Sequence, residues 1–280
     1  MVDRPLIPAM RRLLLVASLL VLAVGIPLML RPTETADYFS WTIQPPLTAA
    51  FLGSAYWASF LLEYEASRRH TWDYARVAVP AVFAFTVLTL IATLNNLEKF
   101  HFGDPGVIVS IVTWGWLIVY AVVPIIMAVI WVRQSREPGV DGPRIRPTPM
   151  WFRTAGAITG VALIAYGAVM FVRPSAVASS WPWALTTLTA QAVAAWLVGI
   201  GIASLHAAWE ADWERIEPAM AANFALGVLE IYSLVRFRDD VDWDRASGWI
   251  YLVVVIALGL LGAYGWFAAT RPINTDHRAG

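Results

Sequence analysis

The feature that most constrains this chain is a series of long apolar stretches without Asp, Glu, Lys or Arg. A helix crosses a hydrocarbon core about 30 Å thick with about 20 mainly apolar residues. Seven charge-free stretches approach or exceed that length: 13–30, 38–62, 77–97, 105–132, 154–172, 174–209 and 246–270. An eighth, 218–235, contains Glu230 and is still long enough to cross. We therefore predict an all-α integral membrane protein whose eight transmembrane helices contact the lipid bilayer.

Composition supports a membrane protein and excludes some functions. The chain is 59% hydrophobic and 14% charged, with a mean hydropathy of +0.61, whereas soluble domains carry about 25% charged residues. Its net charge of zero gives no excess of positive charge that would indicate nucleic-acid binding. Because the chain has no Cys, disulfides, thiolate metal ligands and cysteine-bound iron–sulfur clusters are excluded. No motif indicates a catalytic site, metal or cofactor, so the sequence favours a protein that is not an enzyme and leaves an enzyme as an alternative.

The distribution of arginine predicts the orientation. Short loops rich in Lys and Arg stay on the cytoplasmic side. Most of the basic residues fall in the N-terminal tail, the second and fourth loops and the C-terminal tail, which an eight-span topology places on one side. We expect a bacterial cytoplasmic membrane protein with both termini cytoplasmic.

The two halves of the chain resemble each other in order, which is the signature of an internal repeat. The matches pair Arg31-Pro32 with Arg173-Pro174, Leu47-Thr48-Ala49 with Leu188-Thr189-Ala190, Trp72-Asp73 with Trp213-Glu214, Pro80-Ala81 with Pro218-Ala219, Lys99-Phe100 with Arg236-Phe237, and Trp114 with Trp249. Four crossings return the chain to its starting side, so both copies insert the same way up. We predict two tandem parallel four-helix repeats, residues 1–135 and 151–280, joined by a cytoplasmic Pro- and Arg-rich linker at 136–150.

One segment also carries a resemblance. The run Asn95-Asn96-Leu97-Glu98-Lys99-Phe100-His101-Phe102, followed by the Trp-rich helix from Trp114, resembles uncharacterised actinobacterial multi-pass membrane proteins. Those proteins often have His-Leu-Asp-Arg-Phe-His there, and Asn95 or Asn96 replaces the first His. The resemblance implies a multi-pass membrane protein and no particular activity.

Polar residues form a stripe on each of two predicted helices. Residues three, four and seven positions apart share a helix face. The stripes consist of Thr86, Thr89, Thr93 and Asn96 on the third helix and Asn223, Gly227, Glu230 and Ser233 on the seventh. Aligned through Lys99-Phe100 and Arg236-Phe237, they are equivalent. Either they hydrogen-bond neighbouring helices, or they face one another near the pseudo-axis and line a path.

Glu230 favours the path. A charged side chain at the bilayer centre costs about 2.5–3.5 kcal/mol on insertion scales, so acids there usually have a partner or a water-filled cavity. We expect its partner to be Arg31, Arg173 or a polar group of another helix. The hypothesis is a protonatable carboxyl that takes part in transport; the alternative is a structural carboxyl.

Three other features have simpler explanations. The loop Asp239–Asp244 is rich in acids but lacks the glycine and final Glu of a calcium loop, so we expect a solvated loop. Trp residues near predicted helix ends, among them Trp41, Trp181 and Trp183, are typical of an interfacial belt, with a lipid or carbohydrate platform as the alternative. Gly199 and Gly201 indicate close helix packing.

Two functional classes remain. The first is transport of a small solute or ion along a polar path between the repeats. The second is a non-transporting structural or scaffold subunit that packs against lipid, a membrane-protein partner or a second copy of the chain. A membrane enzyme ranks third, because no catalytic set is visible.

Overall fold

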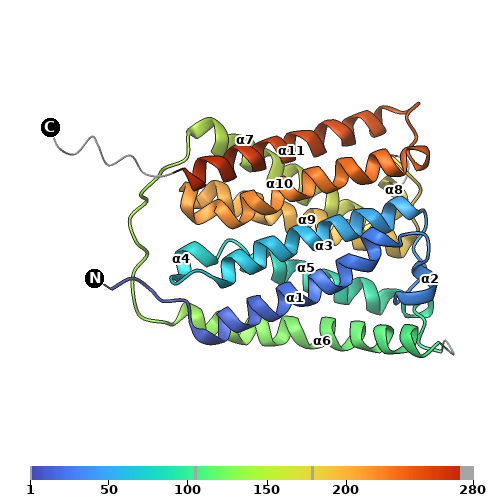
Figure 1. Ribbon diagram of the computed structural model, residues 1–280, viewed down its shortest axis with the longest axis horizontal. Helices are drawn as coiled ribbons and strands as arrows, with labels where there is room; N and C mark the ends of the chain where they lie inside the picture. The colour runs from blue at the N-terminus through green and yellow to red at the C-terminus, as the bar shows by residue number, and fades with distance from the viewer. Residues whose placement is uncertain (1, 104–105, 178–179, 272–280) are drawn as a thin grey trace.

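Every long apolar stretch forms a helix in the computed structural model, which describes residues 2–103, 106–177 and 180–271 (Figure 1). The long helices of the described residues are α1 (Pro8–Leu30), α3 (Pro46–Ser67), α5 (Val79–Asn95), α6 (Val107–Ser135), α7 (Met150–Val172), α9 (Thr187–Glu210), α10 (Trp213–Arg236) and α11 (Ala246–Thr270). Between them lie α2 (Thr35–Tyr38), α4 (Trp72–Ala75), α8 (Pro174–Val177) and the 3-10 turns η1 (Leu97–Lys99) and η2 (Arg238–Asp240). The all-α prediction is confirmed for this part of the chain, where the only β pairing is isolated bridges.

Six of these helices are long and apolar enough to cross a membrane: α1, α6, α7, α9, α10 and α11. The chain is therefore a multi-pass integral membrane protein. The prediction for 218–235 is confirmed, because α10 is one of the six. Helix α5, with 17 residues, is shorter. Helix α3 is outside the six; it is rich in Ala and Ser and almost wholly buried.

Local sequence explains where several helices begin. Proline occupies the first turn of α1, α3 and α5, where its missing N–H removes no hydrogen bond. Thr186 caps α9 in a capping box with Thr189. Asp212 caps α10 by accepting from the N–H groups of Glu214 and Arg215.

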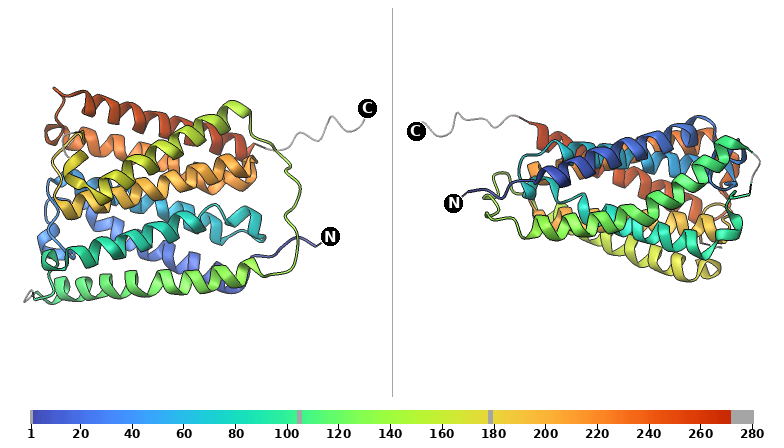
Figure 2. Two further views of the ribbon diagram at one scale, coloured as in Figure 1. Left: turned by 180° about the vertical axis from the view of Figure 1, so that it is seen from behind. Right: turned by 90° about the horizontal axis from the view of Figure 1, so that it is seen from below.

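The bundle has a buried centre and an apolar rim. Helix α3 packs against α10, and α5 against α9. Helices α1 and α6 cover one side and α7 and α11 the other (Figures 1 and 2). In the most apolar 18-residue segment of each helix, 83% of the α9 residues are buried, compared with 22% of those in α6 and in α7. The outer helices therefore present their apolar faces to lipid.

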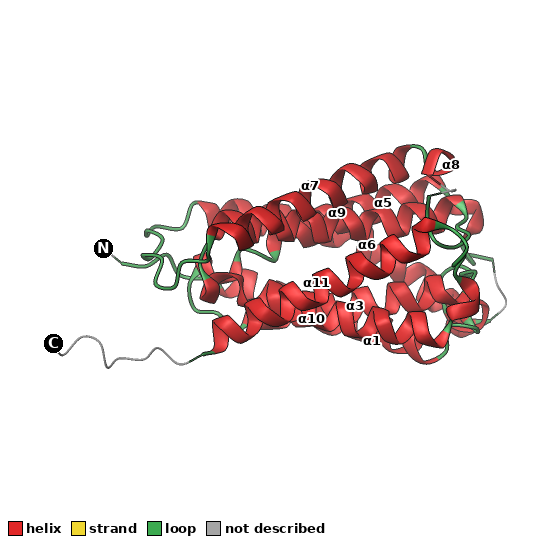
Figure 3. Cartoon of the chain, turned by 90° about the horizontal axis from the view of Figure 1, so that it is seen from above, coloured by secondary structure: helices red, strands yellow, loops and turns green. Residues whose placement is uncertain are grey.

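The two ends of the bundle differ in chemistry. Helix α1 begins and α11 ends at the same end, which we call the proximal end; η1 and η2 lie at the other, distal end (Figures 1 and 3). The linker that follows α6 runs across the proximal end. It is held there by hydrogen bonds from Arg4 N to Val140 O (3.0 Å) and from Arg146 Nη1 to Ala269 O (2.8 Å).

Glycine permits the closest helix contacts. A Cβ added to Gly201 of α9 would lie 2.8 Å from the Gly160 carbonyl oxygen of α7, and one added to Gly227 of α10 would lie 2.5 Å from the Gly259 Cα of α11. The predicted role of Gly201 in close packing is confirmed. At Gly199 the nearest atom would be 3.5 Å away, which is ordinary contact.

Candidate functional site

Glu230 lies inside the bundle in the distal half of α10. Its side chain is 2% exposed, the Tyr251 hydroxyl of α11 donates to Oε2 at 2.9 Å, and the Ser54 hydroxyl of α3 also interacts with the carboxyl, although no hydrogen bond of 3.5 Å or less reaches Oε1. Among the described residues no Arg, Lys or His forms an ion pair with it. Of the partners expected for Glu230, the arginines are therefore wrong: Arg31 pairs with Glu34 in the loop after α1. A polar group on another helix is the partner instead.

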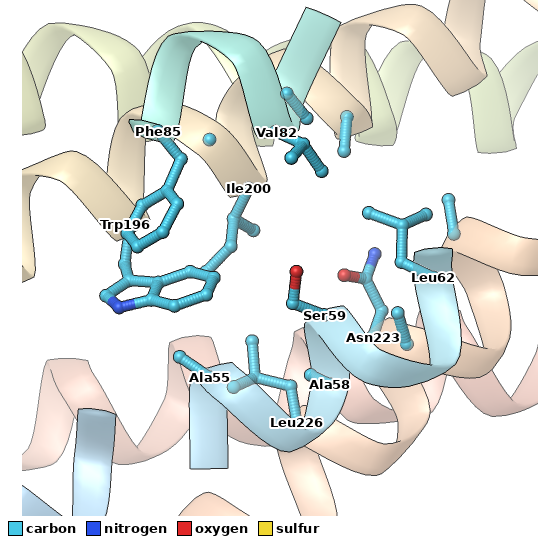
Figure 4. A pocket seen from close by; sticks show the side chains of 15 residues that line it. Ala55, Ala58, Ser59, Leu62, Val82, Phe85, Trp196, Ile200, Asn223 and Leu226 are labelled. Carbon is cyan, nitrogen blue, oxygen red and sulfur yellow. The ribbon is translucent and has the colours of Figure 1, made fainter. Parts of the chain in front are cut away.

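Asn223 lines a small cavity at the centre of the bundle, between α3, α5, α9 and α10 (Figure 4). The cavity has a volume of about 50 Å³ and is lined mostly by apolar side chains such as Phe85, Trp196 and Leu226. The only polar side chains in its wall are those of Ser59 and Asn223. Since about 10–15 Å³ admits one water molecule, a few can fit. Glu230 is not part of this wall.

The stripe on α5 bonds to its own helix and its neighbours. Thr93 Oγ1 donates to Thr89 O at 2.8 Å and accepts from Trp116 Nε1 of α6 at 3.0 Å. Asn96 Nδ2 donates to Gln191 Oε1 of α9 at 2.7 Å. Thr86 donates to Phe83 O at 2.9 Å. These three side chains therefore connect helices or cap carbonyls, as the structural alternative predicts, and none lines the central cavity.

The stripe on α10 divides between two neighbours. Ser233 Oγ lies 3.3 Å from Ser54 Oγ of α3, while Glu230 binds Tyr251 of α11. Among the described residues no hydrogen bond joins the α5 stripe to the α10 stripe. These contacts do not support the expectation that the two stripes face one another. The α5 stripe bonds to α6 and α9, whereas the α10 stripe contacts α3 and α11.

Glu63 of α3 is a second buried carboxyl that the sequence pattern missed. It is 1% exposed, Ser59 Oγ donates to its Oε1 at 2.7 Å, and its Oε2 has no hydrogen-bond partner. It directly follows the charge-free stretch 38–62, so hydropathy places it at the membrane surface. The Ser59-to-Glu63 spacing of one helical turn was the available signal.

A buried charge cluster closes the proximal end, and the sequence analysis did not identify it. Arg76 binds both oxygens of Glu210, and also Asp141 of the linker at 2.5 Å. Arg215 lies 3.3 Å from both Glu210 and Asp73. Burial lowers the pKa of Arg76, but the hydrogen bonds to Glu210 and Asp141 outweigh it, so the pKa is raised. The cluster joins α4, α9, α10 and the linker.

The tryptophans fall into two groups. Trp114, Trp209 and Trp249 are more than half exposed, as expected of an interfacial belt. The belt prediction is wrong for Trp41, Trp181 and Trp183, which are at most 5% exposed. These rings pack on other rings; Trp183 also donates to Thr48 Oγ1 at 2.9 Å.

The acidic loop is structural in part. Asp240 Oδ2 accepts from Leu47 N at 3.0 Å and so ties η2 to the start of α3, while Asp242 pairs with Arg245 at 2.9 Å. No group of three or more His, Cys, Asp or Glu in the described ranges could hold a metal ion.

Comparisons of the chain with protein-family models, with curated proteins and with solved structures find no match.

Proposed function

We propose that this protein transports a small solute or ion, with Glu230 of α10 as a protonation site on the distal side of the central cavity between α3, α5, α9 and α10. The observation that carries the proposal is a buried carboxyl that interacts with the hydroxyl groups of Tyr251 and Ser54 and with no basic side chain among the described residues. Such groups in a membrane are expensive to maintain and mark ion or proton pathways.

Other polar groups extend from Glu230 toward the proximal end. Asn223 is seven residues earlier on α10, about 10 Å away along the helix axis. It shares the central cavity with Ser59, which donates to Glu63. The sequence of carboxyl, amide, hydroxyl and carboxyl supports a path through the central helices. Because the cavity between them holds only a few water molecules, transport requires these helices to separate.

The predicted repeat remains part of the proposal, and matching hydrogen bonds support it. Ahead of α1, Trp72 N donates to Arg4 O at 3.0 Å; ahead of α7, Trp213 N donates to Arg146 O at 2.9 Å. At the distal end, His101 N donates to Ser40 O at 3.0 Å, and Asp242 N to Pro182 O at 2.9 Å. At each end, the two hydrogen bonds join similar positions in the first and second halves of the chain.

These matching hydrogen bonds favour an alignment of α5 with α10 that is shifted by four residues, about one helical turn, from the alignment through Lys99-Phe100 and Arg236-Phe237. Counting back equally from His101 and Asp242 pairs Glu230 with Thr89 rather than Thr93. Thr89 is also buried, and its hydroxyl has no hydrogen-bond partner. In this register the two copies differ in the side chain at this position, which is Thr89 in the first copy and Glu230 in the second.

We further propose eight crossings, with α3 and α5 spanning beside the six apolar helices, and the proximal end facing the cytoplasm of a bacterium. Helix α3 packs antiparallel to α10, from the Leu47–Asp240 contact at the distal end to the Arg69–Glu217 ion pair at the proximal end. Both helices therefore extend through the same thickness of the bundle. The hydropathy of α3 is lower because its side chains contact other helices and not lipid. The concentration of arginine at the proximal end supports the orientation.

Proton movement into liposomes tests the proposal. Purified protein is reconstituted with the dye pyranine inside, a proton gradient is imposed, and amino acids, sugars and monovalent ions are added in turn. We expect at least one condition in which the wild type accelerates internal acidification, and Glu230→Gln abolishes it. Glu65→Gln, at a partly exposed position on α3, is the control that retains flux. Full flux in Glu230→Gln contradicts the assignment, and no flux with any member of the panel supports the alternative.

The alternative is a scaffold subunit that packs against lipid, a protein partner or a second copy. A specific observation favours it: Thr93, Asn96 and Ser233 all make interhelical contacts. On this alternative, Glu230 contributes stability alone.

A further inference from the structure

A second cavity, which we call the lateral groove, lies between α7 and α11 in the distal half of the bundle. Its volume is about 590 Å³, within the range of ligand sites. Helices α9 and α10 contribute to its wall, as does the segment containing Trp181 and Pro182. The wall is mainly aliphatic, and the adjoining faces of α7 and α11 carry highly exposed apolar side chains such as Val161 and Val253. The groove therefore adjoins the lipid.

Three buried polar atoms in this wall make no hydrogen bond of 3.5 Å or less: Glu230 Oε1, Trp181 Nε1 and Ser247 Oγ. The Glu230 and Trp181 side chains are 2% and 5% exposed. An unsatisfied buried polar group costs about 1–3 kcal/mol. A purely hydrocarbon occupant leaves these atoms unsatisfied. The occupant that fits has an apolar chain and, near its distal end, polar groups that accept hydrogen bonds.

The rim of the groove carries both signs of charge. Arg245 lines the rim, and its half-exposed guanidinium lies 2.9 Å from Asp242. An exposed guanidinium binds phosphate well, while the neighbouring carboxylate attracts an ammonium group and repels a purely anionic headgroup. This pair is complementary to a zwitterionic headgroup.

From these observations we infer that the lateral groove binds one acyl chain of a zwitterionic phospholipid from the distal leaflet. The chain lies against Leu163, Ile250 and Val254. Ester oxygens accept from Trp181 Nε1–H and from the neutral carboxyl of Glu230. The phosphate contacts Arg245, and the ammonium contacts Asp242. This inference does not rest on the transport proposal.

Retention of phosphatidylethanolamine by the purified protein, measured by native mass spectrometry, tests the inference. Ala162→Phe and Ile250→Trp add bulk at groove positions that are exposed to lipid and tolerate substitution. Their matched controls are Ala165→Phe and Val253→Trp, on the same helices and outside the wall. We expect the wild type and controls to retain the lipid, and both groove variants to bind it at least roughly tenfold more weakly, a difference of about 1.4 kcal/mol.

The headgroup and the polar contacts are tested in the same assay. Phosphatidylglycerol and diacylglycerol are expected to compete poorly. Trp181→Phe is expected to weaken phosphatidylethanolamine and diacylglycerol alike, because both carry the ester oxygens that accept from Trp181 Nε1–H. Equal retention by groove variants and controls, or none by the wild type, overturns the site. Equal binding of phosphatidylglycerol overturns the zwitterionic ligand. Proton flux is measured separately, so the result is the same whether or not the protein transports.

Discussion

The guanidinium of Arg76 binds both carboxylate oxygens of Glu210, with Nη2 2.9 Å from Oε2 and Nε donating to Oε1. The two side chains are 10% and 0% exposed. Arg76 precedes α5, and Glu210 ends α9, the helix against which α5 packs. The pair therefore fixes the proximal end of the central helices, and Asp141 extends it to the linker.

Breaking this pair is expected to destabilise the protein strongly. Removing one partner of a buried ion pair costs about 3–5 kcal/mol when the other charge is left uncompensated. That is an upper bound here, because Arg76 keeps Asp141 and Arg215 keeps Asp73 as partners. Glu210→Gln should therefore lower the unfolding temperature in detergent by several degrees. The control is Arg31→Gln, which breaks the exposed pair with Glu34, and exposed pairs contribute about 0–1 kcal/mol. Similar unfolding temperatures for the two variants would show that the cluster does not stabilise the fold.

The Glu230–Tyr251 hydrogen bond should be a modest contribution to stability. Interhelical hydrogen bonds in membrane proteins average about 0.6 kcal/mol. A double-mutant cycle with Glu230→Gln and Tyr251→Phe should give a coupling energy of that order, measured by denaturant unfolding in mixed micelles. A coupling energy near zero would mean that the two side chains do not interact. A combined loss of flux and unchanged stability in Glu230→Gln would separate transport from packing.

The contact between Gly227 and Gly259 is expected to admit no side chain. A Cβ at Gly227 meets the backbone of α11 at 2.5 Å. Gly227→Ala should therefore cost about 1–3 kcal/mol by overpacking. Gly115→Ala is the control, since nothing lies within 4 Å of its added Cβ. Thermal unfolding of both variants measures the difference. Equal stability would mean that α10 and α11 separate easily.

The orientation can be tested by labelling, because the chain has no native cysteine. Asp239→Cys places a thiol at a distal position whose side chain is 95% exposed, and Arg136→Cys places one in the proximal linker. A membrane-impermeant maleimide should label Asp239→Cys in intact bacterial cells and Arg136→Cys only after permeabilisation. The reverse pattern would place the termini outside the cell. Labelling of both variants in intact cells would show that the proximal and distal ends do not lie on opposite sides of the membrane.

Helix positions were predictable because hydropathy is a property of residues that are adjacent in sequence. The uncertain stretch 218–235 forms the apolar helix α10, and Gly201 packs closely against α7 as expected. The failures share one cause. Trp41, Trp181 and Trp183 fall near helix ends, as belt residues do, yet the packing of other helices buries them. Glu63 follows an apolar run as an interfacial acid would, yet it is buried among neighbouring helices.

By itself the sequence determined the apolar helices, the basic, proline-rich segment at 136–150, and the presence of one acid within an apolar helix. The tertiary structure decided what that acid contacts. Hydropathy and periodicity report which residues a helix can bury, but the rotation and register of each helix depend on packing between residues far apart in the chain. For this reason Tyr251, and no arginine, is the partner of Glu230, and the lateral groove beside it was visible only in the folded protein.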